Sequence, residues 1–206
     1  KSVEARAGEI AALGPIALSS YSPNGDDWAA GWLLQVLNKY DPQGLEIFAN
    51  DSKGWFETDS DVEIDYRPLQ KALLSECFEE ADRFTSATLR QLAGPGAELR
   101  GYVYFSEVEF IPGVDLATLD RLWLAYSQGR FGFSVQARLL NSLGGRYDRL
   151  WPRIGWKKEG VWTRYPNAFS WNISAPEGHM PLINQLRGVR LMDALLTHPA
   201  LASRVK

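Results

Sequence analysis

Cysteine and histidine are scarce in this chain, and their scarcity excludes several kinds of site. The 206 residues include one cysteine, Cys77, so no internal disulfide can form. The two histidines, His179 and His198, have no carboxylate partners at the spacing of zinc ligands. A GxSxG nucleophile motif is absent, and the Gly-Gly pairs lack the Lys-Ser/Thr of a phosphate-binding loop. We therefore expect no catalytic residues, no metal site and no enzyme activity.

Long apolar runs are absent as well. No run approaches the roughly 20 residues that a helix needs to span a bilayer. With 45% hydrophobic and 23% charged residues, the composition is that of a soluble globular protein with a real core. A lone cysteine indicates a reducing compartment, and the stretch LLSECFEEAD around Cys77 predicts a helix with a buried, structural thiol. Because the chain begins at Lys1 and not at methionine, we expect a processed or trimmed form.

Charge is distributed unevenly along the chain. Residues 121–190 contain 11 Arg and Lys but only 3 Asp and Glu, a net charge of +8, whereas the whole chain has a formal net charge of −3. Such a basic stretch within an acidic chain suggests an anionic partner for that face. The alternative is that the basic and acidic regions attract each other in the folded chain.

Aromatic residues gather in the same basic stretch, and most of them must be core, since aromatics dominate core burial. Eleven within about 50 residues is more than a small core usually takes, so some are expected to line a site for a large flat apolar ligand. The residues are Trp123, Tyr126, Phe131, Phe133, Tyr147, Trp151, Trp156, Trp162, Tyr165, Phe169 and Trp171.

Hydrophobic periodicity predicts an all-α fold. The expected helices cover 28–40, a pair within 68–92, 115–123 with Asp115 as N-cap, 134–143 ended by Gly144-Gly145, and 181–196 starting at Pro181. Residues 43–60 are polar and are interpreted as a linker, whereas 152–176 shows turns and no helical period.

Several strings in this sequence resemble the genomes-uncoupled-four family of tetrapyrrole-binding regulators of magnesium chelatase. They are FSEVEFIPGVDLATLDRLW (105–123), YSQGRFGFSVQARLLNSLGG (126–145), IGWKKEGVWTRYP (154–166) and APEGHMP (175–181), with the lead-in IDYRPLQKALLSECFEEAD at 64–82. The resemblance covers residues 64–198. One departure is Gly113, where the family often has cysteine.

The resemblance implies an all-helical, cupped-hand core with an apolar groove for a porphyrin. We expect a small N-terminal helical appendage and linker at 1–60 and a porphyrin-binding core with a C-terminal helix at 61–206. The groove walls are expected from the loops at 94–112 and 157–180. Candidates for the aromatic walls are Phe105, Phe131, Phe133, Phe169 and Trp171, although each of them could also be plain core.

Two polar features lie near the expected last helix. Asn184, Arg187 and Arg190 are spaced by three residues and therefore lie along one side of a helix, where they could clamp the propionates of a porphyrin. The alternative is a solvated basic face. His179 could be an axial metal ligand, but we favour a turn histidine that bonds to backbone, and Glu177 is interpreted as a first-turn acid of the last helix.

By resemblance, the expected ligands are protoporphyrin IX and Mg-protoporphyrin IX, and the expected function is stimulation of magnesium chelatase in chlorophyll biosynthesis, with a role in tetrapyrrole and plastid signalling. The expected partner is the large, porphyrin-binding H subunit of the chelatase, with peripheral contact at thylakoid or envelope membranes. The implied location is the chloroplast stroma or, alternatively, the cytoplasm of a cyanobacterium. A rival hypothesis is a single-stranded nucleic-acid-binding domain that uses the basic aromatic face, although no nucleic-acid motif is present.

Overall fold

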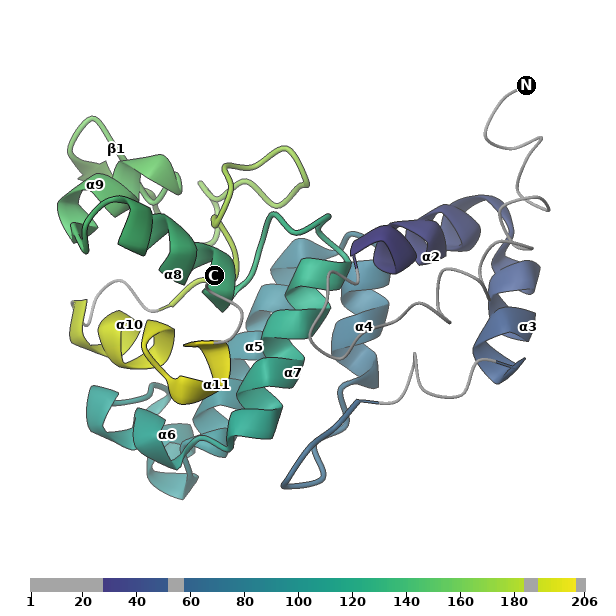
Figure 1. Ribbon diagram of the computed structural model, residues 1–206, viewed down its shortest axis with the longest axis horizontal. Helices are drawn as coiled ribbons and strands as arrows, with labels where there is room; N and C mark the ends of the chain where they lie inside the picture. Colours follow the sequence, from purple (N-terminus) through teal and green to yellow (C-terminus); the bar gives the residue numbers. More distant parts are fainter. Residues whose placement is uncertain (1–27, 52–57, 184–188, 203–206) are drawn as a thin grey trace.

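A computed structural model describes residues 28–51, 58–183 and 189–202, and the regular secondary structure within them is almost entirely helical (Figure 1). This confirms the all-α prediction, and the two short strands form an antiparallel hairpin that pairs Lys157 with Trp162. The elements are α2 (Trp28–Tyr40), α3 (Pro42–Asp51), α4 (Arg67–Leu74), α5 (Phe78–Leu92), α6 (Pro95–Arg100), the 3-10 helix η2 (Phe105–Phe110), α7 (Gly113–Ala125), α8 (Phe133–Ser142), α9 (Tyr147–Arg153), β1 (Lys157–Lys158), β2 (Val161–Trp162), α10 (Val189–Leu196) and α11 (Pro199–Ala202).

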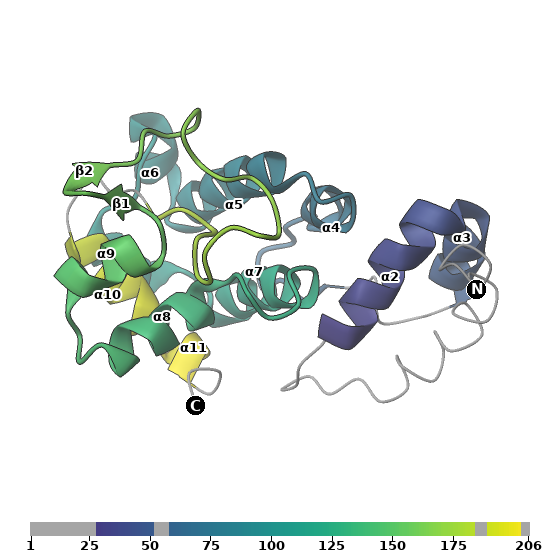
Figure 2. The ribbon, with the colours of Figure 1, turned by 90° about the horizontal axis from the view of Figure 1, so that it is seen from above.

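Helices α5 and α7 occupy the middle of the molecule (Figures 1 and 2). Helix α4 packs on α5 and α7, and α2 packs on α4 and α7 while α3 follows on the outer side. At the opposite end lie α8, α9 and the hairpin, and α10 packs on η2 and α8. Among the described residues, no helix has both the length and the apolarity needed to cross a membrane.

Aromatic rings hold the centre of the core together. The rings of Phe78 and Trp123 stack with their centroids 6.2 Å apart, and Phe131 meets Phe78 edge-on at 5.6 Å. The indole N–H of the fully buried Trp123 donates a hydrogen bond of 2.9 Å to the hydroxyl of Thr85. Each fully buried apolar side chain contributes about 1.5–3 kcal/mol, so these residues fix α5 against α7.

The N-terminal helix packs on this core through buried leucines. Leu33, Leu34 and Leu37 of α2 are buried, and Gln35 donates from Nε2 to the carbonyl oxygens of Leu73 (3.2 Å) and Tyr126 (2.8 Å). Part of the segment expected as an appendage therefore packs against the core.

The linker expected at 43–60 was wrong in its first part, because α3 occupies Pro42–Asp51. The carboxylate of Asp41 accepts a hydrogen bond of 2.9 Å from the backbone N–H of Gly44, and Pro42 takes the first helical position. Asp followed by Pro is a helix-start signal, which the polar composition of the segment obscured.

Other boundaries also differ from the predictions. Helix α7 begins at Gly113, and Asp115 lies inside its first turn, fully buried, so Asp115 is not the N-cap. Residues 181–183 are not helical, and the helix expected from Pro181 is described only from Val189 onward. Pro152 lies inside α9, which the sequence interpretation left out.

Cys77 also differs from its prediction. It precedes α5 and is an exposed free thiol, so the prediction of a buried, structural cysteine was wrong. The helices at 28–40, 68–92 and 134–143 are confirmed within a residue or two at each end. Gly144 and Gly145 end α8 with positive φ angles of 67° and 73°, as expected of a left-handed cap.

Candidate ligand-binding site

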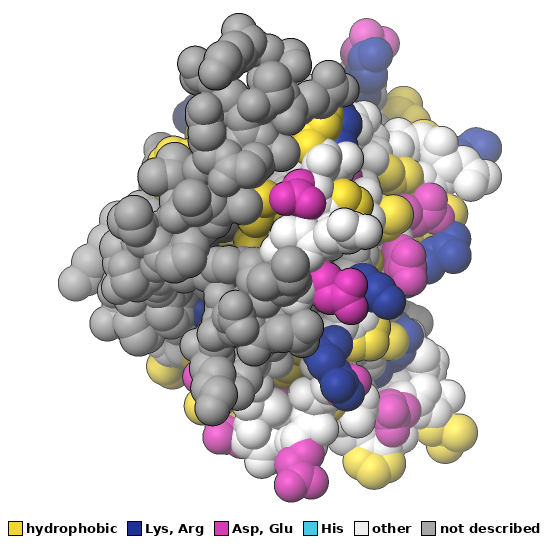
Figure 3. All heavy atoms as spheres, turned by 90° about the vertical axis from the view of Figure 1, so that its right-hand side faces the viewer, with side chains coloured by type: hydrophobic (Ala, Val, Ile, Leu, Met, Phe, Trp, Pro, Cys, Tyr) yellow, Lys and Arg dark blue, Asp and Glu magenta, His cyan; other side chains and the backbone are white. Residues whose placement is uncertain are grey.

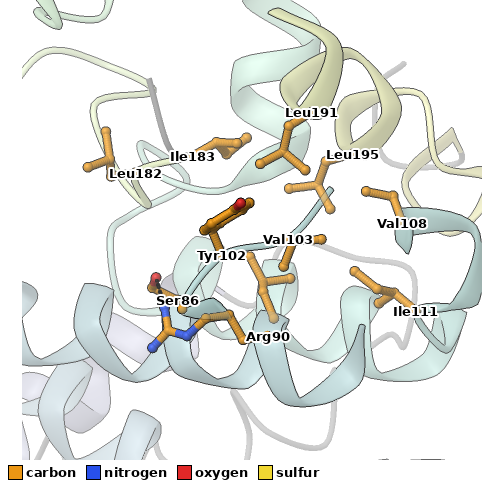
Figure 4. Close-up of a pocket in the computed structure, with 12 residues that line it drawn as sticks. Ser86, Arg90, Tyr102, Val103, Val108, Ile111, Leu182, Ile183, Leu191 and Leu195 are labelled. Atoms are coloured by element: carbon orange, nitrogen blue, oxygen red, sulfur yellow. Dashed lines mark hydrogen bonds between the residues drawn. The ribbon is translucent and has the colours of Figure 1, made fainter. Parts of the chain in front are cut away.

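An apolar cavity lies between α5, the segment that leads into η2, and α10 (Figure 4). Leu191 and Leu195 reach into it from α10, opposite Ser86 and Arg90 on α5, and Tyr102 lies between them. Its volume is about 50 Å³. The lining residues are Ser86, Leu89, Arg90, Gly101, Tyr102, Val103, Val108, Ile111, Leu182, Ile183, Leu191 and Leu195.

The lining residues at 101–111 lie within the loop expected at 94–112 as one groove wall. The lining residues at 182–183 and 191–195 lie outside the second expected loop, 157–180, whose role as a wall stays a prediction. Both sets of lining residues reach the cavity because α10 packs against η2.

One cation lies in the cavity wall. The guanidinium of Arg90 is half-buried and donates a hydrogen bond of 2.8 Å to the hydroxyl of Ser86, one turn earlier on α5. Sequence reasoning missed Arg90. Helical periodicity shows that Arg90 follows Leu89 in an amphipathic helix, but it does not show which part of the protein the Arg90 side chain borders. Its position beside Leu89 at the end of an apolar face was the available signal.

A second cation lies at the start of α10. The guanidinium of the exposed Arg190 lies 5.5 Å from the ring centroid of Phe105, which is 47% exposed. Cation–π contacts of this kind contribute about 0.5–1 kcal/mol at exposed sites. Phe105 shares η2 with Val108, and Arg190 precedes Leu191, so this pair adjoins the cavity. The structure therefore brings two of the predicted site residues together.

A group of aromatic rings lies in the loop between the hairpin and the last described helices. Phe169 and Trp171 stack at 5.5 Å, and Tyr165 meets both rings edge-on at 5.7 and 5.8 Å. Phe169 is 7% exposed, Trp171 is half-buried and Tyr165 is 43% exposed. We call residues 163–175 with this ring group the aromatic loop.

Backbone hydrogen bonds hold the aromatic loop in place. Arg130 donates to the carbonyl oxygens of Ile173 (3.0 Å) and Ala175 (2.8 Å). The buried His179 bonds through Nδ1 to the carbonyl of Ile154 at 2.7 Å and accepts at Nε2 from the backbone N–H of Ser170 at 3.3 Å. Burial lowers the pKa of His179 below its ordinary value.

These contacts confirm His179 as a histidine that bonds to backbone in a turn, since both ring nitrogens have backbone partners. Glu177 is not in the first turn of a helix; it pairs with Arg138 at 3.1 Å and with Arg153 at 3.5 Å. Among the described residues, no group of three or more His, Cys, Asp or Glu side chains could hold a metal ion.

One carboxylate links the aromatic loop to the cavity wall. Asp82 on α5 is 1% exposed and accepts a hydrogen bond of 2.6 Å from the backbone N–H of Leu182, which lines the cavity. It also interacts electrostatically with the hydroxyl of Tyr165. Burial raises the pKa of Asp82 from 3.8 to about 7.

Phe131 and Phe133 lie in the core with no exposed area, so the structure does not support a wall role for either ring. Gly132 between them has a φ of 141°, a conformation suited to glycine. Phe131 packs on Phe78, and both rings belong to the same buried cluster as Trp123. Asn184 and Arg187 lie outside the described residues.

Ion pairs of the basic stretch join residues within it, as in Arg138–Glu177 and Arg146–Asp148. At the α2–α3 end, acidic and basic side chains of the described residues lie interspersed (Figure 3). Among the described residues visible on that face, the acidic side chains do not gather into a patch of one sign.

A family model described as GUN4-like matches residues 59–199, a span that includes all the cavity residues. Among curated relatives, the Ycf53-like protein of Synechocystis sp. is 48% identical over 173 residues, which are 83% of this chain and 74% of that protein. The tetrapyrrole-binding protein, chloroplastic, of Arabidopsis thaliana is 37% identical over 144 residues, which are 66% of this chain and 54% of that protein.

Two solved structures have the same fold. The structure of GUN4 from Chlamydomonas reinhardtii superposes with a TM-score of 0.67 at 38% identity, covering 70% of this chain and 93% of that one. Ligand-free GUN4 of Arabidopsis thaliana gives a TM-score of 0.63, also at 38% identity, covering 68% of this chain and 99% of that one.

Proposed function

The chain belongs to the GUN4-like family, and from that premise we propose that it binds a tetrapyrrole as a non-catalytic regulator. The observation that carries the proposal is the apolar cavity with Arg90 in its wall and the Phe105–Arg190 pair beside it. A porphyrin needs apolar and aromatic surface for its ring and cations for its two propionates, and Arg suits planar recognition of carboxylates. The single-stranded nucleic-acid hypothesis is not favoured by the family match.

The cavity is small compared with its proposed ligand. Its volume of about 50 Å³ is well below the roughly 300–1,000 Å³ of typical ligand pockets. We infer that the porphyrin lies across the cavity mouth or that the wall at 101–111 separates from those at 182–183 and 191–195 as it enters. Phe105 and Trp171 are the more exposed of the predicted wall residues and are the candidates for contacts with the porphyrin ring. Phe169 stacks on Trp171.

Protoporphyrin IX and Mg-protoporphyrin IX are the proposed ligands. His179 has backbone partners at both ring nitrogens, so we propose recognition through ring surface and propionates and not through an axial histidine. A carrier must also release its ligand, so we expect submicromolar to micromolar affinity, about 8–9 kcal/mol.

The titration of protoporphyrin IX against the whole chain tests this proposal. Tryptophan emission and the Soret band should change together and saturate in the micromolar range. A parallel titration with a fluorescent single-stranded oligonucleotide is the control, because its binding would weaken steeply with salt. No saturable change at tens of micromolar porphyrin would refute the proposal.

We further propose that the bound porphyrin serves magnesium chelatase through its large H subunit. The name of the Arabidopsis relative supports the ligand class and a chloroplast setting, and the Synechocystis relative supports the cyanobacterial alternative. Presentation of the porphyrin at high effective concentration lowers the porphyrin requirement of the partner. A contact that shifts the partner's conformational equilibrium raises turnover as well.

Chelatase turnover with and without this chain, at low and at saturating porphyrin, separates the two routes. Delivery alone lowers the apparent KM, whereas a conformational effect raises kcat at saturation. We expect both effects. If stimulation vanishes at saturation, the conformational part is wrong, and if the chain alone inserts magnesium, the non-catalytic proposal is wrong.

A further inference from the structure

Asp82 joins three parts of the molecule that are far apart in sequence. Its carboxylate projects from α5 and accepts from the backbone N–H of Leu182, 100 residues later, at 2.6 Å. It also interacts electrostatically with the hydroxyl of Tyr165, whose ring packs on Phe169 and Trp171. One buried side chain thus holds both the aromatic loop and the cavity wall at 182–183 against the same turn of α5.

Among the residues that the structure describes, few charged groups face this carboxylate. Glu79 and Arg83 lie on α5 itself and pair with each other at 2.6 Å. Tyr165 comes from the aromatic loop and also interacts with Arg83, while Leu182 presents its backbone N–H. The nearby charge of Glu79 disfavours the ionised form of Asp82, and within the described part of the chain the carboxylate forms no ion pair.

We propose that Asp82 is a proton-sensitive latch that positions the aromatic loop and the cavity wall at Leu182. This inference rests on the proposed tetrapyrrole function for its purpose, but the latch itself does not need a ligand. In the closed arrangement the neutral carboxyl suits both neighbours, since its carbonyl oxygen accepts from Leu182 and its hydroxyl can donate to the oxygen of Tyr165. Ionisation keeps the bond from Leu182 but leaves a buried charge that water would solvate better.

The direction of the effect follows from the pKa values. In the closed state the pKa of Asp82 is about 7, whereas 3.8 is its ordinary value and applies when the carboxyl is exposed to water. The closed state therefore binds a proton more tightly than the open state, and protonation favours closure. The closed state is most strongly favoured below pH 4. It becomes less favoured as the pH rises from 4 to 7, and the equilibrium between the closed and open states changes little above pH 7.

Asp82→Asn is the matched test because an amide copies the neutral carboxyl. Its oxygen can accept from Leu182 N–H, and its NH₂ group can donate to the oxygen of Tyr165. The variant should stay closed at every pH. Glu80→Gln is the control, because Glu80 is an exposed acid on the same helix.

The measurement is amide hydrogen exchange of the ligand-free chain by NMR at pH 5, 6 and 7, corrected for the intrinsic exchange rate. The N–H of Leu182 exchanges only when its bond to Asp82 breaks, and that of Ala168 reports on the aromatic loop. In the wild type and in Glu80→Gln, opening should increase roughly tenfold per pH unit. In Asp82→Asn it should not change.

Two results would overturn the latch. One is the absence of a pH slope at Leu182 in the wild type, and the other is an equal slope in Asp82→Asn. If Asp82→Asn fails to fold, the carboxyl carbon of Asp82 in the wild type can be titrated by NMR instead, and a midpoint near 4 would refute the proposal.

The ligand is tested separately from the latch. A closed Asp82→Asn chain should take up protoporphyrin IX several-fold more slowly than wild type at pH 7, and the two should converge at pH 5. A pH-dependent latch in a chain that binds no porphyrin would refute the proposed function and leave the latch intact. Porphyrin binding at one rate in both chains would show that the latch does not control the site.

Discussion

Gly31 of α2 faces the backbone of Ala125 in α7 so closely that a β-carbon on Gly31 would collide with the carbonyl oxygen of Ala125. Only glycine lets the two helices approach this far. Gly31→Ala should therefore push α2 off α7 and lower the free energy of unfolding by about 1–3 kcal/mol. Urea denaturation measures the change.

Gly96→Ala is the control for this substitution. Gly96 also lies in a helix, α6, but a β-carbon there would meet only the flexible end of Arg100, at 3.1 Å. Alanine favours helix, so stability should stay equal or rise by up to about 1 kcal/mol. Equal denaturation midpoints for wild type and Gly31→Ala would mean that α2 is not packed on α7 in solution.

Asp115 is a buried acceptor that ties the segment before α4 to α7. Its carboxylate accepts from the hydroxyls of Ser60 (2.5 Å) and Tyr66 (2.9 Å) and from the backbone N–H of Asp61 (3.0 Å). Asp115→Ala leaves all three donors without this acceptor, but only the hydroxyl of Tyr66 is fully buried, where the loss costs about 1–3 kcal/mol. We expect a loss of about 2–4 kcal/mol by thermal and urea unfolding, since water can replace the acceptor for Ser60 and Asp61 only in part.

The comparison variant is Asp148→Ala, which removes an exposed carboxylate paired with Arg146 at 2.9 Å. Exposed ion pairs contribute about 0–1 kcal/mol. Similar losses for the two variants would show that the buried network does not carry the stability assigned to it.

The helices of this fold were predictable from the sequence where the pattern that indicates them involves residues close together in the chain. The periodicity of α5 and the glycines after α8 were sufficient, because they depend on neighbours in sequence. Asp115 was predicted as an N-cap on the same local grounds, yet its carboxylate bonds to residues about 50 positions earlier. A capping rule that considers only neighbouring residues cannot show that a carboxylate bonds to residues far away in the sequence.

The site was predictable only in part. Phe105 and Arg190 meet as a pair, which their separation of 85 positions did not indicate; the resemblance named both. Phe131 is as aromatic as Phe105, but only the packing on Phe78 shows that the ring of Phe131 belongs to the core. Arg90 and Asp82 were missed because the sequence of an amphipathic helix does not show which residues a cation or an acid on it will contact in the folded chain.

His179 provides a prediction about protonation. Its Nε2 accepts from Ser170 N–H, so the ring proton is on Nδ1, where it is donated to the carbonyl of Ile154. Burial lowers the pKa of His179 below 6.5, so its contribution to stability is fully present above pH 6.5 and is lost as the pH falls below that value. Asp82 acts in the opposite direction, because its raised pKa makes stability fall as pH rises from 4 to 7.

Long-range ¹H–¹⁵N NMR of the imidazole checks both statements about His179. The spectrum at pH 7.5 should show the Nδ1–H tautomer, and the titration midpoint should lie below 6.5. Addition of zinc should leave the ring signals in place. An Nε2–H tautomer, a midpoint above 6.5 or a zinc-dependent shift would contradict the backbone role.

Arg190 and Arg90 provide the most direct test of the proposed ligand. If each makes a charge-assisted bond to a propionate, Arg190→Ala and Arg90→Ala should each weaken protoporphyrin binding by about 1.5–3 kcal/mol. Arg190 is exposed and Arg90 donates to Ser86 on its own helix, so stability should change by no more than about 1 kcal/mol, the size of the cation–π contact that Arg190 loses. Arg187→Ala should weaken binding similarly.

Arg149→Ala is the matched control, because Arg149 is an exposed cation of the same basic stretch on α9. Titration of a porphyrin whose propionates are esterified completes the test, since it removes the anions and keeps the ring. Wild type should lose affinity for the ester, whereas Arg190→Ala and Arg90→Ala should bind acid and ester more nearly alike. If both variants keep wild-type affinity for the free acid while remaining folded, the propionates do not meet these cations, and the ring alone holds the ligand.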